Sequence, residues 1–104
     1  MRKIAYNARA LSALGHEARL SIFRLLVKAG NDGLNVGDMG AYLSIPATTL
    51  AHHLSTLVEA GLVKQQKRGR EVINRVDFDV MRDVMEFLTS QCCSGVEIVN
   101  KQAA

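Results

Sequence analysis

The segment from Ser44 to Arg70 constrains the fold of this chain most, because a polar-faced helix and a basic hairpin follow each other directly. Pro46 suits a helix start, since its missing N–H would have no intrahelical acceptor there. Leucines at 50, 54 and 57 then repeat at helical spacing until Gly61. Residues 62–67 and 71–77 resemble two strands, joined at Arg68-Gly69-Arg70. The segment therefore predicts a helix from Ala47 to Ala60 followed by a two-stranded hairpin.

The rest of the chain predicts further helices around this unit. Apolar residues recur at helical spacing over 2–14, 17–28, 36–43 and 80–91, and Asp79 is the expected N-cap of the last helix. The order of four helices, a hairpin and a helix predicts a mainly α winged helix-turn-helix. We expect one domain over residues 1–95 and a short flexible tail over 96–104.

Composition narrows the class of protein. With 104 residues, 48% of them hydrophobic, the chain has more apolar surface than a small core buries, so we expect a homodimer. No apolar run approaches the roughly 20 residues of a membrane span. We therefore expect a soluble, cytoplasmic protein without a membrane partner. Thirteen basic against ten acidic residues give a net charge of +3, whose distribution matters more than its size.

The predicted helix and hairpin present groups that suit duplex DNA. Hydroxyls and imidazoles on the helix face opposite the leucines can contact bases or phosphates. Such a face alone is equally compatible with simple solvation, but the hairpin carries four cations within seven residues and no acid among them. His53 lies at the edge of the apolar face, where packing or a phosphate contact is more plausible than base reading. The expected DNA-facing residues are Thr48, Thr49, His52, His53, Ser55, Thr56, Lys64, Lys67, Arg68 and Arg70.

These segments resemble a known family. Residues 15–26 resemble the second helix of the ArsR/SmtB family of metalloregulatory repressors, and residues 46–63 resemble its recognition helix and first wing strand. Residues 67–72, with Arg75 and Val76, resemble its wing, so the resemblance covers about residues 8–95. It implies a homodimer formed by the first and last helices. Such a dimer represses transcription from a pseudo-palindromic operator until a ligand lowers its affinity for DNA.

The resemblance also indicates where an inducer would bind. The family's Cys-Val-Cys site is absent, because those positions hold Asn35, Val36 and Gly37, and no histidine follows His53 to form a zinc site on the last helix. The vicinal pair Cys92-Cys93 resembles a third branch, which binds trivalent arsenic through such a pair and one further cysteine. No cysteine lies at the corresponding position, near Val99.

Two protein sulfurs suffice for methylarsenite, or for arsenite that keeps a hydroxide or takes a sulfur from the other subunit. Zinc would need two further ligands. We therefore expect no permanent cofactor, and trivalent arsenic as inducer at Cys92 and Cys93.

Other interpretations of the thiols stay open. Cys92 follows Met81, Met85 and Leu88 at helical spacing and could extend a buried stripe, whereas Cys93 is expected to point to a different side. The same dimer could respond to oxidants or reactive sulfur. It could also be an architectural protein without any ligand. A thiol enzyme is disfavoured, because the chain has neither a Cys-x-x-Cys motif nor a phosphate-binding glycine loop.

Overall fold

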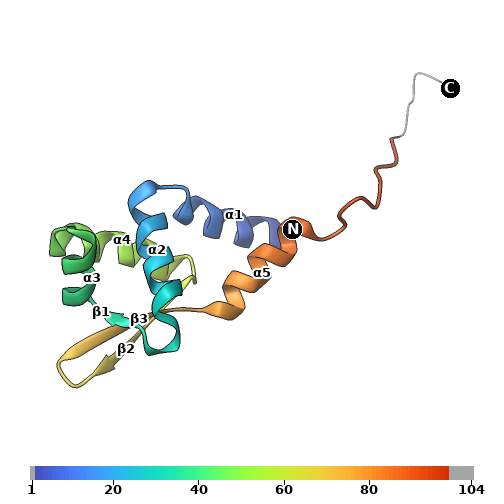
Figure 1. The fold of residues 1–104 in the computed structure, drawn as a ribbon. Coiled ribbons are helices and arrows are strands. Elements are labelled where there is room, and N and C mark those ends of the chain that lie inside the picture. Colours follow the sequence, from blue (N-terminus) through green and yellow to red (C-terminus); the bar gives the residue numbers. More distant parts are fainter. Residues whose placement is uncertain (1, 99–104) are drawn as a thin grey trace.

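The computed structural model describes residues 2–98, within which it has five α-helices and three β-strands (Figure 1). The helices are α1 (Arg2–Leu14), α2 (Glu17–Ala29), α3 (Val36–Leu43), α4 (Ala47–Glu59) and α5 (Phe78–Thr89), with a short 3-10 turn at Gly30–Asp32. The strands are β1 (Leu34–Asn35), β2 (Val63–Arg68) and β3 (Glu71–Val76). This order confirms the predicted winged helix-turn-helix. Of the predicted tail, 96–104, residues 99–104 lie outside the described part of the chain.

Local capping explains where α3 begins and ends. The side chain of Asn35 accepts a hydrogen bond from the Asp38 N–H at 2.8 Å, which satisfies one of the free donors of the first turn. Ser44 adopts a left-handed conformation (φ 55°) and its N–H donates to the carbonyl of Gly40. The chain therefore turns sharply after α3, and α4 starts three residues later, directly after Pro46.

The wing is part of a three-stranded antiparallel sheet with the order β1-β3-β2. Strand β1 was not predicted, because two residues are too few to show an alternating pattern. Gly33 allows it to approach β3: a Cβ atom at this position, where φ is +66°, would lie 2.5 Å from the carbonyl oxygen of Asn74. The buried side chain of Asn74 completes the junction by donating to the carbonyl of Leu34 at 3.2 Å.

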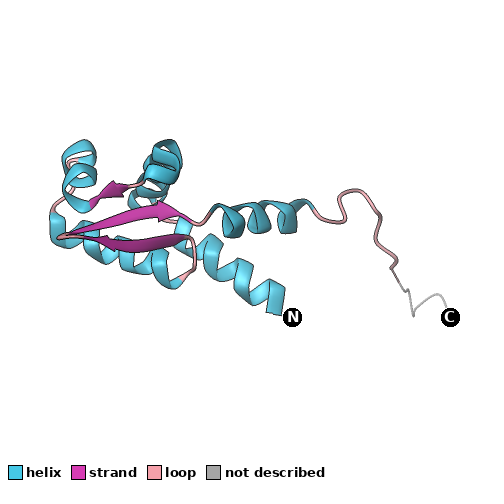
Figure 2. Cartoon of the chain, turned by 90° about the horizontal axis from the view of Figure 1, so that it is seen from below, coloured by secondary structure: helices cyan, strands magenta, loops and turns pink. Residues whose placement is uncertain are grey.

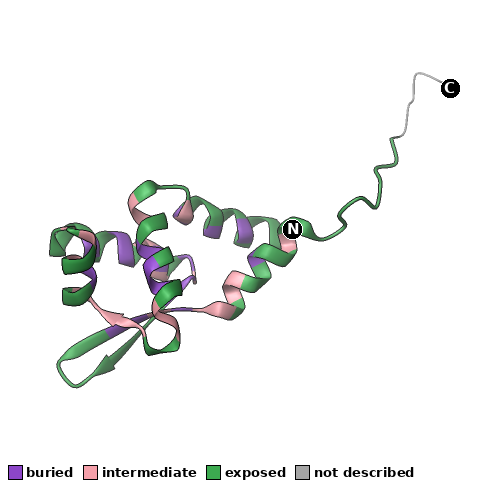
Figure 3. Ribbon diagram, in the orientation of Figure 1, coloured by how far each residue is buried: buried purple, intermediate pink, exposed green. Residues whose placement is uncertain are grey.

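The hydrophobic core lies where α2, α3 and α4 meet the base of the wing (Figure 3). Leu26, Met39, Leu50 and Leu57 are fully buried there. Burying each such side chain contributes about 1.5–3 kcal/mol, so this region carries most of the packing energy of the subunit.

The bounds of α5 correct the prediction by two residues at each end. Its N-cap is Asp77 instead of Asp79: one carboxylate oxygen accepts hydrogen bonds from the N–H groups of Asp79 and Val80 at 3.2 and 3.3 Å. The helix ends at Thr89. Cys92 and Cys93 therefore lie beyond the helix, and the alternative in which Cys92 extends a buried helical stripe is wrong.

Helices α1 and α5 lie side by side at one end of the molecule (Figures 1 and 2). Toward the core, α1 buries Asn7, Ala10 and Ala13, whereas α5 buries Val84 alone. Large apolar side chains on both helices stay exposed within the subunit; these are Ile4, Tyr6, Leu11, Met85 and Leu88.

Candidate DNA-binding surface and thiol pair

Helix α4 presents an uninterrupted polar face to solvent. Because Leu50, Leu54 and Leu57 are buried on one side, the side chains of Thr48, Thr49, His52 and Ser55 are exposed on the other. Thr56 is half-buried, and its hydroxyl donates to the carbonyl of His52 at 3.4 Å. Hydroxyls and an imidazole on an exposed helix are groups that can contact base edges and phosphates in a major groove.

The structure places His53 away from that face. Its side chain is only 8% exposed, and its Nδ1 atom has no hydrogen-bond partner among the described residues. The ring of His16 packs against it with a centroid separation of 4.8 Å, and the ring of His52 lies 5.9 Å away. Burial lowers the pKa of His53, and the nearby His16, Arg19 and His52 lower it further. His53 therefore packs inside the subunit and does not lie on the exposed polar face of α4.

The wing carries exposed positive charge. Lys64, Lys67, Arg68 and Arg70 all have exposed side chains, and Gly69 forms the tip with a φ of +63°. Lys64 lies 3.9 Å from the carboxylate of Asp77, whereas Lys67, Arg68 and Arg70 form no ion pair within residues 2–98. The two strands project from the helices (Figure 1), so these three cations can reach an anionic surface next to α4.

The thiol pair lies in a turn after α5. Both cysteines are exposed and unoxidised, and their Sγ atoms are 3.3 Å apart. Neighbouring side chains on a helix diverge by about 100°. Here Gln91 and Cys93 adopt left-handed conformations with φ of 64° and 62°, and the resulting turn brings the second sulfur beside the first. The expectation that Cys93 points to a different side is therefore wrong.

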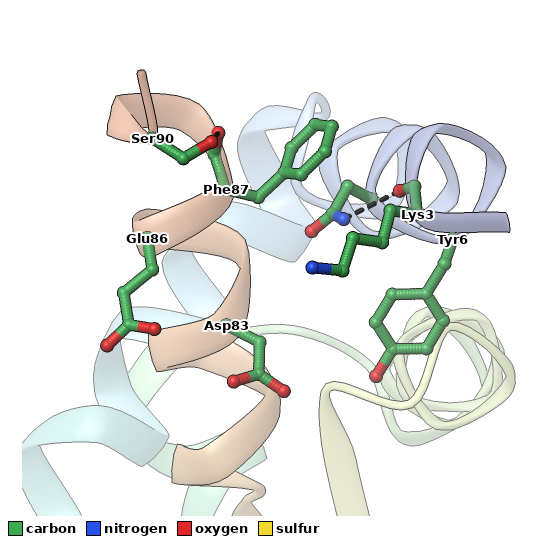
Figure 4. A pocket seen from close by; sticks show the side chains of 7 residues that line it. Lys3, Tyr6, Asp83, Glu86, Phe87 and Ser90 are labelled. Carbon is green, nitrogen blue, oxygen red and sulfur yellow. Dashed lines mark hydrogen bonds between the residues drawn. The ribbon is translucent and has the colours of Figure 1, made fainter. Parts of the chain in front are cut away.

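A pocket of about 390 Å³ separates α1 from α5 close to this turn. Figure 4 shows that Lys3 and Tyr6 of α1 face Asp83 and Phe87 of α5 across it. Ser90, two residues before Cys92, forms part of the rim. Sequence patterns gave no sign of this pocket, because it depends on how closely the two helices pack.

Within residues 2–98, no three or more His, Cys, Asp or Glu side chains are grouped so that they could hold a metal ion. None of the helices in the same range is long and apolar enough to cross a membrane.

Comparison with known proteins identifies relatives among transcription regulators. A family model described as a helix-turn-helix domain matches residues 14–66. The chain is 40% identical over 64 residues to an uncharacterised HTH-type transcriptional regulator, YceK, of Bacillus subtilis. It is 42% identical over 60 residues to a protein of Halobacterium salinarum named as a putative arsenical resistance operon repressor, ArsR. These matches cover 62% and 58% of the chain but only 63% and 46% of the two relatives.

Solved structures agree with this assignment. An ArsR-like transcriptional regulator from Rhodococcus sp. RHA1 superimposes with a TM-score of 0.76 at 26% identity, covering 85% of this chain and 80% of that one. The reduced form of HlyU from Vibrio cholerae superimposes with a TM-score of 0.67 at 27% identity, covering 88% and 94%. With its helix-turn-helix, its wing and these relatives, the chain belongs to the ArsR/SmtB family of winged helix-turn-helix regulators.

Proposed function

We propose that this protein is a homodimeric repressor that binds operator DNA and is released when trivalent arsenic binds Cys92 and Cys93. The observation that carries the DNA-binding part is the exposed polar face of α4 beside a wing with three unpaired cations. In this arrangement α4 enters the major groove, and Lys67, Arg68 and Arg70 contact phosphates or the adjacent minor groove. Threonine, serine and histidine offer little bidentate base recognition, so phosphate contacts and DNA shape contribute much of the affinity.

The dimer is supported by the apolar surface on α1 and α5. Met85 and Leu88 are each 59% exposed and Ile4 is 60% exposed, although all three lie on helices that already pack against each other. Several exposed large apolar side chains on two neighbouring helices are typical of a subunit interface. A two-fold dimer through α1 and α5 would cover it and would present two copies of α4 to successive major grooves.

The geometry of the thiols supports arsenic as the inducer. Trivalent arsenic prefers thiolate ligands, and both sulfurs are accessible to solvent. Their 3.3 Å separation is shorter than the edge of about 3.8 Å between two thiolates on one tetrahedral zinc with bonds of about 2.3 Å. Two sulfurs per chain suit methylarsenite directly. Arsenite would need a hydroxide, or a sulfur of the second subunit, to complete its ligands.

Release then follows from the place of the thiols in the fold. A ring closed across Cys92 and Cys93 reorganises the turn that borders Ser90 and the pocket between α1 and α5. Because these two helices form the proposed dimer interface, the change alters the spacing of the two α4 helices. A coupling of about 1–3 kcal/mol would weaken operator binding about 5–150-fold.

A redox trigger is the second candidate, and the exposed thiols favour it. Two accessible sulfurs in close proximity are open to oxidation or persulfidation. One structurally similar protein, HlyU, was solved in a form described as reduced. An intersubunit bridge between cysteines would act on the same helix ends as arsenic.

Fluorescence anisotropy on the DNA upstream of the chain's own gene, at fixed salt, tests these proposals. We expect wild-type protein to prefer this DNA over random duplex and to be released by arsenite or methylarsenite. The Cys92→Ser and Cys93→Ser variants should bind DNA normally but resist release, whereas Ser94→Ala should behave as wild type. Release by peroxide but not by arsenicals would support the redox candidate, and unaltered release of the serine variants would remove the thiols from the mechanism. Zinc serves as a further control.

A further inference from the structure

A second basic site lies away from the wing, where α1 meets α2 and the C-terminal half of α4. Arg9 and Ser12 of α1, Arg19 of α2, and Thr56 and Glu59 of α4 line a crevice of about 200 Å³. The three helices pack against one another here. The crevice opens at the C-terminal half of α4, next to Thr56, the last residue of α4 that was predicted to face DNA.

Arg19 is held in a fixed orientation at this site. Its Nε–H donates to the carbonyl of Ala13 at 2.6 Å, one of the carbonyls that the end of α1 leaves without a helical partner. Its two terminal amino groups have no hydrogen-bond partner among residues 2–98. A guanidinium that is anchored in this way loses little freedom when it binds an anion.

The other groups around the crevice suit an anion with oxygen atoms. Arg9 is exposed and, within the described part of the chain, forms no ion pair; Glu59, the only acid in the lining, pairs with neither arginine. Ser12 and Thr56 add hydroxyls. Two arginines and the hydroxyl of Ser12 around a small opening offer the positive charge and the donors that a phosphate group requires.

The location favours the phosphate of a DNA backbone. Thr56 lies one helical turn after His52, on the same stripe of α4 as the exposed polar face. His16, at the start of α2, is exposed beside this stripe. The crevice therefore continues the proposed DNA-binding surface toward the junction between α1 and α2. Half to two-thirds of protein–DNA hydrogen bonds go to the backbone, and such contacts fix the orientation of the recognition helix.

We propose that the crevice between α1, α2 and α4 binds a backbone phosphate of operator DNA through Arg9, Arg19 and Ser12. This inference rests on the proposed DNA-binding function. It extends the footprint of each subunit from α4 and the wing to the junction between α1 and α2. Arg9 and Ser12 would increase the affinity for DNA by contacting the phosphate and would not contact the base edges.

The test compares Arg9→Gln with Arg24→Gln in salt-dependent anisotropy on operator and on random DNA. Arg24 is an exposed arginine on the α2–α3 side of the molecule, so both variants lose the same charge. One phosphate contact per subunit corresponds to a decrease of about 2 in the salt slope of a dimer. We expect this decrease, and an affinity loss on the order of tenfold on both DNAs, for Arg9→Gln only. Glu59→Gln should have the opposite effect and tighten binding.

Two outcomes would overturn the inference, and a third would instead overturn the proposed DNA-binding function on which it rests. Equal salt slopes for the Arg9 and Arg24 variants would overturn it while leaving DNA binding by α4 and the wing intact. NMR titration with inorganic phosphate addresses a free anion as the ligand: if phosphate alone saturates the crevice and Arg9→Gln leaves DNA affinity unchanged, the DNA contact is wrong. If wild-type protein shows no preference for its own upstream DNA, the proposed function fails first.

Discussion

Two regions of the molecule are built in different ways: the helix-turn-helix body, residues 17–76, and the C-terminal arm, which is α5 and the turn that follows it, residues 78–94. Helices α2, α3 and α4 surround fully buried side chains such as Leu26, Met39 and Leu50, and Asn74 closes the junction with the sheet through hydrogen bonds. In contrast, α5 buries only Val84 and exposes Met85 and Leu88, and the turn that follows it carries two exposed thiols. The surface that would read DNA is fixed by the fold of one subunit. The proposed sensor end depends on a second subunit or a ligand for its final arrangement.

The largest expected effect is on the free energy of unfolding, and truncating one leucine in each region tests the contrast between them. Leu54→Ala removes a side chain that is 1% exposed, so we expect a loss of about 2–5 kcal/mol in the free energy of unfolding. Leu88→Ala removes one that is 59% exposed, and its effect should appear mainly as weaker dimerisation. Urea unfolding at two protein concentrations separates the cases: the Leu54→Ala loss should be independent of concentration. A comparable, concentration-independent loss for Leu88→Ala would show that α5 belongs to the subunit core.

A smaller effect is expected at the junction between the body and the arm. Asp77→Ala removes the N-cap of α5 and should cost about 1 kcal/mol. Asp77→Asn keeps the capping oxygen and loses only the 3.9 Å ion pair with Lys64, whose side chain is 63% exposed. Such a surface pair contributes little, so Asn should be nearly neutral. Amide hydrogen exchange should show faster exchange in α5 of the Ala variant and unchanged protection in α4. Faster exchange in both helices would mean that body and arm unfold together.

The same contrast explains how far the sequence predicted the structure. The bounds of α3 were predicted correctly, because a capping asparagine and a clear turn define them locally. The leucines of α4 showed its buried side for the same reason. Strand β1 is defined instead by its distant partner β3. The apolar residues of the first and last helices were assigned to the interface with a second copy of the chain, and this assignment came from the family resemblance.

The site shows the same limit. The four wing cations could be predicted from the local sequence of the hairpin, and all four are exposed in the structure. The cysteines were predicted at the end of the last helix, which was expected to reach Gln91 but ends at Thr89, three residues before Cys92. The backbone turn at Gln91 and Cys93 had no signal in the sequence, since neither residue is one that favours a left-handed conformation. The crevice at Arg9 and Arg19 depends on three helices that are distant in the sequence.

The last prediction uses pH to perturb the body without touching the arm. Burial lowers the pKa of His53 in the folded state, and His16, Arg19 and His52 lower it further. Between this lowered pKa and the unfolded value of about 6.5, the unfolded chain binds more protons than the folded one. Stability should therefore decrease as pH falls below about 6.5 and level off below the folded pKa.

Chemical unfolding between pH 7.5 and 5 should show this decrease in wild type and in His52→Gln, whose side chain is exposed. In His53→Leu the decrease should be reduced, because a neutral side chain takes the place of the buried imidazole. If the free energy of unfolding of His53→Leu depends on pH as strongly as that of wild type, a group other than His53 causes the pH dependence.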